Sequence, residues 1–525
     1  MDVRPLRGSL VIKSRVHIGS RAQRDGFSKL LPTAVTFSGK LRLRCLGAII
    51  GGMKTRTKFS VDTNPMRGLP PVHRLVASAG VNDLVRRVPA AVVADAARRV
   101  LEEARNALAV AQGTGAISMP TEQELAERVT LEALRRNTPT LQRVVNATGV
   151  VLHTGLGRAR LADAARDALL EVATHHAAVE IDRETGRRGS RSDHVRWLLR
   201  ELSGAEDATV VNNCAGAVFL AVITLAAQRE VIISRGELVE IGGAFRMPDI
   251  IRAGGATLVE IGTTNRTRLS DYSAAITERT GLILRCRPSN FAIIGYTEDV
   301  PASDLVKLGH DHGIPVMDDQ GSGAFLDLTG RNNTLASAVA SGADLITASG
   351  DKLMGGPQAG LILGAKEYVD RISRHPLARA LRVDKFTLAA LEATLRLYRD
   401  PKKAMATIPT LRYLARGEPE LRRMAQRLHA VLRAVLPQNR FGITLVAEHS
   451  AIGGGSLPGE ELATVCVAIC SLRDGPTAEE IARRFRQHYP AVFTRIRGDA
   501  VLLDPRTLEA DEFATIADAA REVAA

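Results

Sequence analysis

The sequence is poor in cysteine and lacks a long apolar segment, and both absences exclude classes of protein. Its 525 residues include five cysteines, odd in number and scattered along the chain. Such a set does not provide a disulfide framework and is typical of a reducing compartment. No stretch approaches the roughly 18 consecutive apolar residues that a membrane helix requires. We therefore expect a cytoplasmic, globular protein without a membrane segment.

Only two of the cysteines lie close together. Cys466 and Cys470 are four residues apart in an apolar run, which is the spacing of neighbours on one face of a helix. No second pair of ligands accompanies them, so the spacing indicates a buried helix face rather than a metal site. We expect no metal in this protein.

The positive charge is concentrated at the N-terminus. The chain carries a net charge of +13, and residues 1–65, with 13 basic and 3 acidic side chains, contribute +10 of it. Such a segment fits a nucleic-acid-binding arm or an organelle-type presequence. Because it has no steady helical or strand period, we favour a disordered extension, or a start codon placed too far upstream of Met53 or Met66.

Three regions follow this extension. Residues 66–140 carry apolar side chains at three- and four-residue spacing over 90–111 and 122–136, which predicts a small helical domain. Thr121 and Glu124 form a capping box at the start of the second helix. Residues 398–525 indicate a small α+β domain, with helices at 418–436 and 478–487 and a hairpin-like stretch at 493–503.

The central region, residues 141–397, alternates short apolar runs with helical stretches such as 216–227 and 302–312. Continuous apolar strands separated by helices predict a mostly parallel, doubly wound α/β domain whose sheet is buried on both faces. Ligands of such sheets bind beyond the carboxyl ends of the strands. The predicted strands are 208–212, 231–234, 257–261, 282–286, 315–318, 344–348 and 359–363.

Three of these strand ends suit one cofactor. Lys352 follows the strand at 344–348 on a short loop, and a lysine desolvated there forms an imine readily. Asp319, with Asp318 as its rival, fits a carboxylate that keeps a pyridinium nitrogen protonated. The small residues Cys214, Ala215 and Gly216 open a helix whose free N–H groups suit a phosphate. Taken singly, each feature has an ordinary alternative: a surface lysine, an acid that caps a turn, a commonplace helix start.

Their order along one α/β domain distinguishes them from these alternatives. A phosphate-binding helix start, then a carboxylate, then a lysine follow one another along the chain. This is the order in the aspartate-aminotransferase-like class of pyridoxal-phosphate (PLP) enzymes, the transferases of fold type I. We therefore predict a PLP enzyme that holds its cofactor as an imine on Lys352.

Longer strings identify a family within this class. They are residues 146–158 (NATGVVLHTGLGR), 184–191 (ETGRRGSR), 237–246 (ELVEIGGAFR), 349–360 (SGDKLMGGPQAG), 376–385 (PLARALRVDK) and 452–459 (IGGGSLPG). They resemble bacterial selenocysteine synthases, the L-seryl-tRNA(Sec) selenium transferases, from about Gly68 to the C-terminus. The chain departs from the family pattern at Arg287, where histidine is expected, at Gly155, where asparagine is common, and at Cys214, where asparagine or a small residue is common.

The resemblance implies the conversion of L-seryl-tRNA(Sec) to L-selenocysteinyl-tRNA(Sec). The seryl amine displaces Lys352 from PLP, the freed lysine takes the α-proton, and the β-hydroxyl leaves to give an aminoacrylyl-tRNA. Selenium from selenophosphate then adds to the alkene. Because the seryl carboxyl is esterified, arginines near the site need another anion, and selenophosphate supplies one.

The resemblance also implies roles for individual residues. Arg158, Arg379 and Arg382 hold the anion beside the catalytic Lys352. Arg379 and Arg382 are three residues apart, on one face if that stretch is helical. Asp351 and Ser289 lie near the cofactor, together with Asp319 and the turn at 214–216.

Recognition of tRNA by the helical domain and assembly into a homodecamer, a pentamer of dimers, are further implications. Active sites at subunit interfaces would allow Arg158 and Lys352 to come from different chains. Four arginines of the helical domain suggest tRNA binding but are equally common on a solvated surface: Arg86, Arg87, Arg98 and Arg99.

Two alternative functions stay open. One is another fold-type-I PLP lyase that acts on a small phosphorylated amino acid or amino sugar. The other is a tRNA-binding protein without catalytic activity, and the intact Lys352 argues against it.

Overall fold

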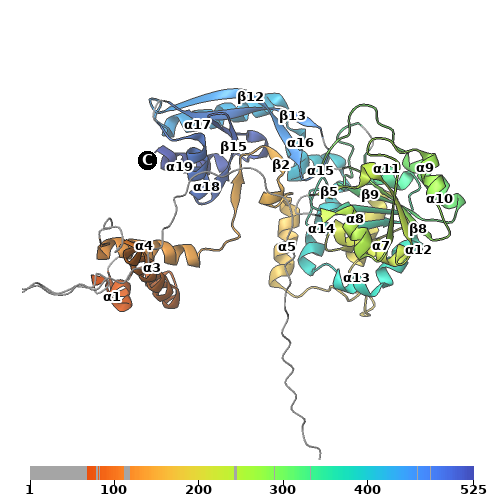
Figure 1. Ribbon diagram of the computed structural model, residues 1–525, viewed down its shortest axis with the longest axis horizontal. Helices are drawn as coiled ribbons and strands as arrows, with labels where there is room; N and C mark the ends of the chain where they lie inside the picture. Colours follow the sequence, from red (N-terminus) through yellow and green to blue (C-terminus); the bar gives the residue numbers. More distant parts are fainter. Residues whose placement is uncertain are drawn as a thin grey trace, which may run out of the picture. The chain divides into compact units, whose positions relative to one another are not determined.

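The computed structural model of the chain describes residues 68–524, except 79–80, 82, 112–118, 242–244, 289, 331–332, 458 and 473–474. The described residues form two compact units that divide between Thr138 and Pro139 (Figure 1). The expectation for residues 1–65 lies outside the described part of the chain.

The first unit is helical. It contains α1 (Val72–Ala77), η2 (Leu84–Arg86), α3 (Ala90–Ala111) and α4 (Glu122–Asn137). Both predicted helices are therefore confirmed. The predicted capping box is also present, because the Thr121 side chain accepts from the Glu124 N–H and the Glu124 carboxylate accepts from the Thr121 N–H. Apolar side chains from α1, α3 and α4 form one buried cluster, which stabilises the three helices against one another.

The second unit is built around a seven-stranded sheet with the order β3-β11-β10-β9-β8-β4-β7. Strand β11 is antiparallel to both neighbours, and every other pair is parallel. Each strand overlaps one of the seven predicted from the sequence, so the predicted α/β class is confirmed. The strands are β3 (Asp207–Val211), β4 (Glu230–Ser234), β7 (Thr257–Ile261), β8 (Thr280–Cys286), β9 (Val316–Gly321), β10 (Leu345–Ser349) and β11 (Gly360–Gly364).

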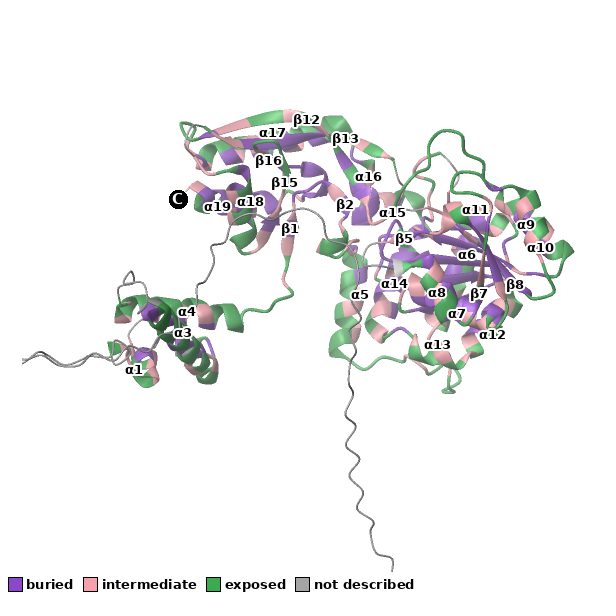
Figure 2. Ribbon diagram, in the orientation of Figure 1, coloured by how far each residue is buried: buried purple, intermediate pink, exposed green. Residues whose placement is uncertain are grey.

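Helices cover both faces of this sheet, and its strands are the most completely buried part of the unit (Figure 2). Alternate residues of one strand enter different cores: Ile232 packs into the first cluster, whereas Val231 and Ile233 pack into the second. This alternation follows from the two-residue period of a strand. The first face carries α6 (Asp193–Ser203), α9 (Leu269–Ala275), α10 (Ala302–Asp311), α11 (Leu335–Ala340) and α14 (Lys385–Tyr398). The second carries α7 (Cys214–Ala226), α8 (Met247–Ala253) and α12 (Lys366–Arg374).

A smaller five-stranded sheet, with the order β15-β16-β13-β12-β2, forms the C-terminal part of the second unit. Helices α17 (Glu418–Val435), α18 (Ala478–Gln487) and α19 (Glu512–Ala524) contribute to its buried core. Its C-terminal strands are β12 (Phe441–Gly453), β13 (Glu461–Ser471), β15 (Arg495–Arg497) and β16 (Ala500–Leu503), and β14 (Ala491–Phe493) lies beside β1. The predicted helices at 418–436 and 478–487 and the hairpin at 493–503 are confirmed.

The position of Cys466 and Cys470 corrects one prediction. Both lie on strand β13, which pairs antiparallel with β12 and β16, and not on a helix. A strand that is buried over most of its length is a continuous apolar run, and such a run cannot be distinguished from a buried helix by periodicity alone. The four-residue spacing was therefore misleading.

Two short strands from the beginning of the central region join the C-terminal elements. Strand β1 (Val144–Asn146) pairs with β14, and β2 (Val150–Leu152) pairs in parallel with β12. The chain therefore contributes β1 and β2 to the C-terminal layer first, then forms the large sheet, and then forms the rest of the C-terminal layer. The remaining elements are η3 (Thr154–Leu156), α5 (Asp163–Thr174), η4 (Arg235–Glu237), β5 (Glu240–Ile241), β6 (Phe245–Arg246), α13 (Pro376–Ala380), α15 (Pro401–Thr407), α16 (Pro409–Ala415) and η5 (Pro505–Thr507).

A buried carboxylate ties β2 to this layer. Asp504 is 0% exposed, and a Cβ added at Gly149, which has a φ of 73°, would overlap its carboxylate. The string at 146–158 therefore requires glycine at this position. Four donors satisfy the carboxylate: Ser450 Oγ at 2.7 Å, Thr464 Oγ1 at 2.9 Å, Arg506 N at 3.0 Å and Arg495 Nη2 at 3.2 Å.

Within the described ranges, no helix has both the length and the apolar character needed to cross a membrane.

Replacing Asp504 should destabilise the C-terminal layer. Asp504→Ala leaves Arg495, whose Nη2 pairs with the buried Asp504 carboxylate at 3.2 Å, without that partner, and breaking a buried ion pair on one side costs about 3–5 kcal/mol. We expect a loss of that size in the free energy of unfolding, measured by urea denaturation. The control is Asp499→Ala, an exposed aspartate of the same hairpin, which should change stability by less than about 0.5 kcal/mol. Equal losses in the two variants would contradict the prediction.

Candidate active site

Lys352 lies in the turn that follows β10 and is only 4% exposed. The turn is held at its base, where the Gly350 N–H donates to the Ala359 carbonyl over 2.8 Å. A Cβ added at Gly321 would come within 3.8 Å of the Lys352 Nζ, so the amine lies against the end of β9. Burying an ammonium without compensation is costly. The lysine is therefore in a position that a soluble protein keeps for chemistry or a specific ion pair.

Asp319 lies on β9 with its carboxyl held by three side chains. Thr347 Oγ1 donates over 2.7 Å, Cys214 Sγ over 3.4 Å and Cys286 Sγ over 3.6 Å. The strand register explains the group, because Cys286 on β8 and Thr347 on β10 lie directly beside Asp319 and point to the same face. Burial raises the pKa of the Asp319 carboxyl, while the hydrogen bonds from Thr347 and Cys214 lower it.

Asp318, the rival acid, points to the opposite face of the sheet. It is 0% exposed and faces the guanidinium groups of Arg285, at 3.5 Å, and Arg287, at 3.7 Å. The two-residue period of the strand therefore separates the two acids. Asp319 lines a cavity with Lys352, and Asp318 does not.

The N-terminus of α7 faces this cavity. The Asn213 side chain caps the helix by accepting from the Gly216 N–H over 2.8 Å. The N–H groups of Cys214 and Ala215 remain at the positive end of the helix dipole, where an anion is favoured. A Cβ added at Gly360 would overlap the backbone of Asn213. The glycine that ends the string at 349–360 thus allows β11 to approach this turn.

The cavity between these elements has a volume of about 250 Å³. It brings together most of the residues that the sequence suggested for the cofactor, and adds some that it did not suggest, such as Ile241, Val218 and Gln358. Its other lining residues are Arg158, Asn213, Cys214, Ala215, Asp319, Gly321, Ser349, Asp351 and Lys352. Ser289, which was also suggested, is outside the described residues.

Arg158 reaches the cavity from the string at 146–158. Its Nη1 lies 2.7 Å from the Asp351 carboxylate, and its Nε has no hydrogen-bond partner among the described residues. The residue has a φ of 58°, an uncommon conformation for a residue with a Cβ. The Ala159 N–H also donates to the Asp351 carbonyl over 3.3 Å. Arg158 and Lys352 therefore line one cavity within a single chain.

Arg379 and Arg382 line a different cavity, of about 350 Å³, together with Arg188 and Arg191. Arg379 is on α13, and Arg382 lies beyond the end of that helix. Arg382 Nη1 is 3.4 Å from the Glu180 carboxylate. The segment nevertheless contacts the chain just before α7, because the Asn212 N–H donates to the Leu381 carbonyl over 2.9 Å. In one chain, the structure does not bring these two arginines to Lys352.

Sequence reasoning missed Cys286, Thr347 and Glu237. The first two could have been found from the strand register, once Asp319 was known. Glu237 follows β4, and its Oε2 accepts from the Cys286 N–H over 3.2 Å. Burial raises the pKa of Glu237 to about 8, against the attraction of Arg285. It lines a second cavity.

Comparisons with known proteins agree with one another. The family described as L-seryl-tRNA selenium transferase matches residues 144–509. The chain is 46% identical to the L-seryl-tRNA(Sec) selenium transferase of Geotalea daltonii over 86% of this chain and 98% of that one. It is 44% identical to that of Rhizobium meliloti, over 88% and 99%.

Among solved structures, D-glucosaminate-6-phosphate ammonia-lyase aligns with a TM-score of 0.52 and 21% identity, over 73% of this chain and 96% of that one. This likeness concerns the fold alone and agrees with the predicted α/β fold class.

The raised pKa of Glu237 predicts a pH-dependent contribution to stability. Because its carboxyl titrates near 8 in the folded chain and near 4.5 when exposed, the folded state binds the proton more tightly. The stability that the folded state gains from binding this proton is fully present below about pH 4.5 and is lost as the pH rises through about 8. In thermal unfolding, the wild type should lose stability between pH 5 and 9 relative to Glu237→Gln. The matching control, Glu240→Gln, removes an exposed glutamate three residues away. Parallel curves for wild type and Glu237→Gln would contradict the prediction.

Proposed function

Because the chain belongs to the L-seryl-tRNA selenium transferase family, we propose that it converts L-seryl-tRNA(Sec) to L-selenocysteinyl-tRNA(Sec) with PLP bound at Lys352. The observation that carries this assignment is the buried Lys352 beside the buried Asp319 in one cavity, with the α7 N-terminus beside them. The relatives at 42–46% identity all bear this activity in their names, so the alternative of a lyase for phosphorylated amino sugars is not favoured.

The donor set of the cavity fits PLP. A buried amine can link to the cofactor aldehyde, a buried carboxyl can meet the ring nitrogen, and the first turn of α7 can accept the phosphate. We assign these roles to Lys352, to Asp319 and to the turn formed by Cys214, Ala215 and Gly216. PLP supplies an electron sink for the pair released from the substrate α-carbon. Ser289 and Asp351 complete the proposed surroundings.

Lys352 is also the proposed base at the α-carbon. Once the seryl amine replaces it, its Nζ is free beside the substrate and can take the α-proton. The β-hydroxyl would then leave as water, so that the seryl group becomes an aminoacrylyl group on the tRNA, and selenium and a proton would add across its double bond as phosphate is released from the donor. We propose selenophosphate as the donor. The pair between Arg158 and Asp351 supports this choice, because the arginine side chain is 28% exposed and pairs with that carboxylate through one outer nitrogen, and so has N–H groups left for an anion.

Arg379 and Arg382 are proposed to hold the same anion. Their separation from Lys352 within one chain supports a site that is completed between subunits, as in a homodecamer built as a pentamer of dimers. The helical unit at residues 68–138 is the proposed tRNA-recognition domain. Four exposed arginines support that role by offering positive charge to phosphates: Arg86, Arg87, Arg98 and Arg99.

Borohydride reduction tests the cofactor assignment. Treatment of the holoenzyme should fix PLP on the peptide that contains Lys352, detected by mass spectrometry, and Lys352→Ala should abolish both the labelled peptide and turnover. Lys307→Ala, which removes an exposed lysine on α10, should leave both intact. A Lys352→Ala protein that is still labelled by borohydride would refute the assignment.

Binding of tRNA tests the substrate. In a gel-shift titration, the full chain should bind selenocysteine tRNA at least about tenfold more tightly than serine tRNA, a difference of roughly 1.4 kcal/mol. Substituting Arg86 and Arg87 together by alanine should weaken binding and reduce its salt dependence. The paired control, Arg422 and Arg423 to alanine, removes two arginines of α17 in the other unit. Equal binding of the two tRNAs, or none, would exclude the proposed substrate.

A further inference from the structure

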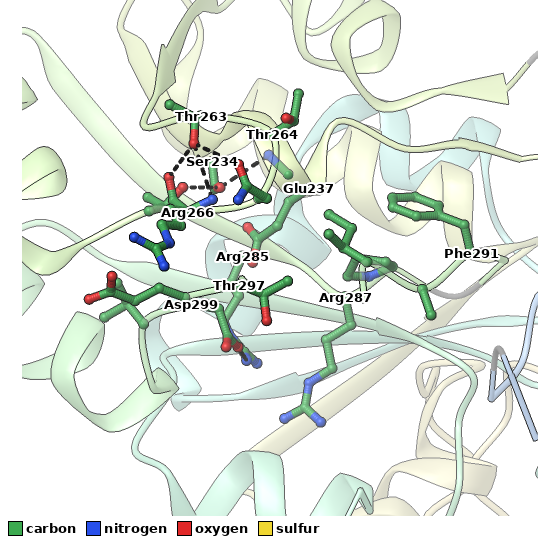
Figure 3. Close-up of a pocket in the computed structure, with 18 of the residues that line it drawn as sticks. Ser234, Glu237, Thr263, Thr264, Arg266, Arg285, Arg287, Phe291, Thr297 and Asp299 are labelled. Carbon is green, nitrogen blue, oxygen red and sulfur yellow. Dashed lines mark hydrogen bonds and ion pairs between the residues drawn. The ribbon is translucent and has the colours of Figure 1, made fainter. Parts of the chain in front are cut away.

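A second cavity lies at the carboxyl ends of β4, β7 and β8. Its volume is about 490 Å³. Glu237 and Arg285 lie near its centre, and Arg266 and Phe291 lie at opposite ends of the wall drawn in Figure 3. The glycine loop of the C-terminal layer contributes Leu457 and Glu460. Two of the strings that carry the family resemblance, 237–246 and 452–459, thus contribute residues to this cavity, which shares no lining residue with the cavity of Lys352.

The charges on its walls argue against a free anion as the ligand. Arg285 already faces Asp318 at 3.5 Å and Asp299 at 4.0 Å. Arg287 faces Asp318 at 3.7 Å and donates to the Asn333 side chain over 2.5 Å. Their positive charge is therefore largely compensated by nearby carboxylates. A site for phosphate or selenophosphate would present a net excess of cations.

The same walls suit a neutral, polar and partly flat ligand. Arg285 and Arg287 line the cavity, and their contacts with Asp318, Asp299 and Asn333 use only some of the five N–H groups of each guanidinium, so each can still donate. Burial keeps Glu237 protonated at neutral pH, since it raises the pKa of this carboxyl to about 8, and a protonated carboxyl donates as well. Phe291 offers a ring face that is 37% exposed. Hydroxyl groups that suit a sugar come from Thr263, Thr264 and Thr297.

This combination is that of a nucleoside site. A base stacks on an aromatic side chain and accepts from arginine N–H groups through its ring nitrogens, while its ribose hydroxyls exchange hydrogen bonds with threonines. The exposed Arg266 on the wall suits the phosphate that would connect such a nucleoside to a longer chain.

The cavity also lies beside the cofactor cavity. The Glu237 carboxyl accepts from the Cys286 N–H over 3.2 Å, and the Cys286 thiol donates to Asp319 over 3.6 Å. Only the end of β8 therefore separates a wall residue of the second cavity from the acid assigned to the cofactor. An amino acid esterified to a ribose suits neighbouring cavities of this kind, because the ester keeps the nucleoside next to the reacting carbon atoms.

We propose that the second cavity holds the 3′-terminal adenosine of the seryl-tRNA, with its base on Phe291 and its ring nitrogens toward Arg285 and Arg287. This inference rests on the proposed function and refines it. The enzyme would then recognise the ester end of its substrate through the nucleoside, in place of the α-carboxylate that the ester removes.

Two small probes test this inference on the holoenzyme. One is L-serine joined through an amide to 3′-amino-3′-deoxyadenosine, and the other is L-serinamide, which has the same linkage without the nucleoside. Binding is followed by the change in cofactor absorbance. The adenosine conjugate should bind at least tenfold more tightly. Phe291→Ala should remove most of that difference and leave the affinity for L-serinamide unchanged.

The matched control is Phe386→Ala, which removes a phenylalanine of similar exposure, 41% against 37%, that lines neither cavity. It should keep the full preference for the adenosine conjugate. Equal affinities of the two probes for the wild type would overturn the inference. So would a preference that survives in Phe291→Ala.

A second variant keeps the test decisive if Phe291→Ala fails to fold. The groups that face Glu237 are Arg285, Asp318, Asp299 and Tyr272. As the pH rises through about 8, Glu237 ionises and loses its donor, so the preference of the wild type for the adenosine conjugate should fall. Glu237→Gln, which keeps an amide donor and does not titrate, should show a flat profile over the same range. A flat profile in the wild type would contradict the inference.

Turnover of full-length seryl-tRNA separates failure of the inference from failure of the proposed function. If the wild type does not convert seryl-tRNA(Sec), the function is wrong and the inference falls with it. If the wild type converts it and Phe291→Ala does so with an unchanged KM, only the nucleoside site is wrong. A KM raised at least tenfold in Phe291→Ala, with kcat changed less, supports both.

Discussion

The burial of Asp319 is the constraint on which the active-site cavity depends. A carboxyl in the middle of a sheet is costly unless its oxygens are hydrogen-bonded. Its three donors, Thr347, Cys214 and Cys286, come from β10, α7 and β8. One carboxyl therefore fixes two neighbouring strands and the helix start that faces them. Because Lys352 follows β10 directly, the same contacts also fix where its amine can lie.

The neighbouring acid shows how a strand can serve two sites. Asp318 and Asp319 are consecutive on β9, so their side chains enter opposite faces of the sheet. Asp319 contributes to the cavity of Lys352, whereas Asp318 neutralises Arg285 and Arg287 beside the second cavity. Each site therefore has its own buried carboxyl, and a change of one residue in the register of β9 would exchange them.

The large sheet could be predicted from the sequence because its strands are short apolar runs with helices between them. The meeting of Asp319, Lys352 and the α7 N-terminus followed from the rule that parallel strands present their carboxyl ends at one edge. The C-terminal layer was harder. Strand β13 is a continuous apolar run, and the pairing of β2 with β12 joins residues some three hundred positions apart, which no local pattern records.

The same reasoning explains which site residues were missed or left separate. Cys286 and Thr347 flank Asp319 only through register, and a single sequence does not fix register. Glu237 ends a 3₁₀ turn and looks like any surface acid until the fold partly buries it and raises the pKa of its carboxyl. Arg379 and Arg382 were grouped with Arg158 by resemblance, yet one chain places them in another cavity.

Arg158 connects the C-terminal layer to the active site. Strand β2 is held in the small sheet by pairing with β12 at Val150 and Leu152, and the overlap of a Cβ at Gly149 with Asp504 fixes the approach to that strand. Arg158 follows Leu152 by six residues, and its guanidinium pairs with the carboxylate of Asp351, the residue before Lys352. This six-residue segment is too short to leave Arg158 in place when the small sheet shifts by a large distance. Any movement of the C-terminal layer against the large domain must therefore displace Arg158 relative to Lys352, and so change the proposed anion site without disturbing the residues assigned to the cofactor.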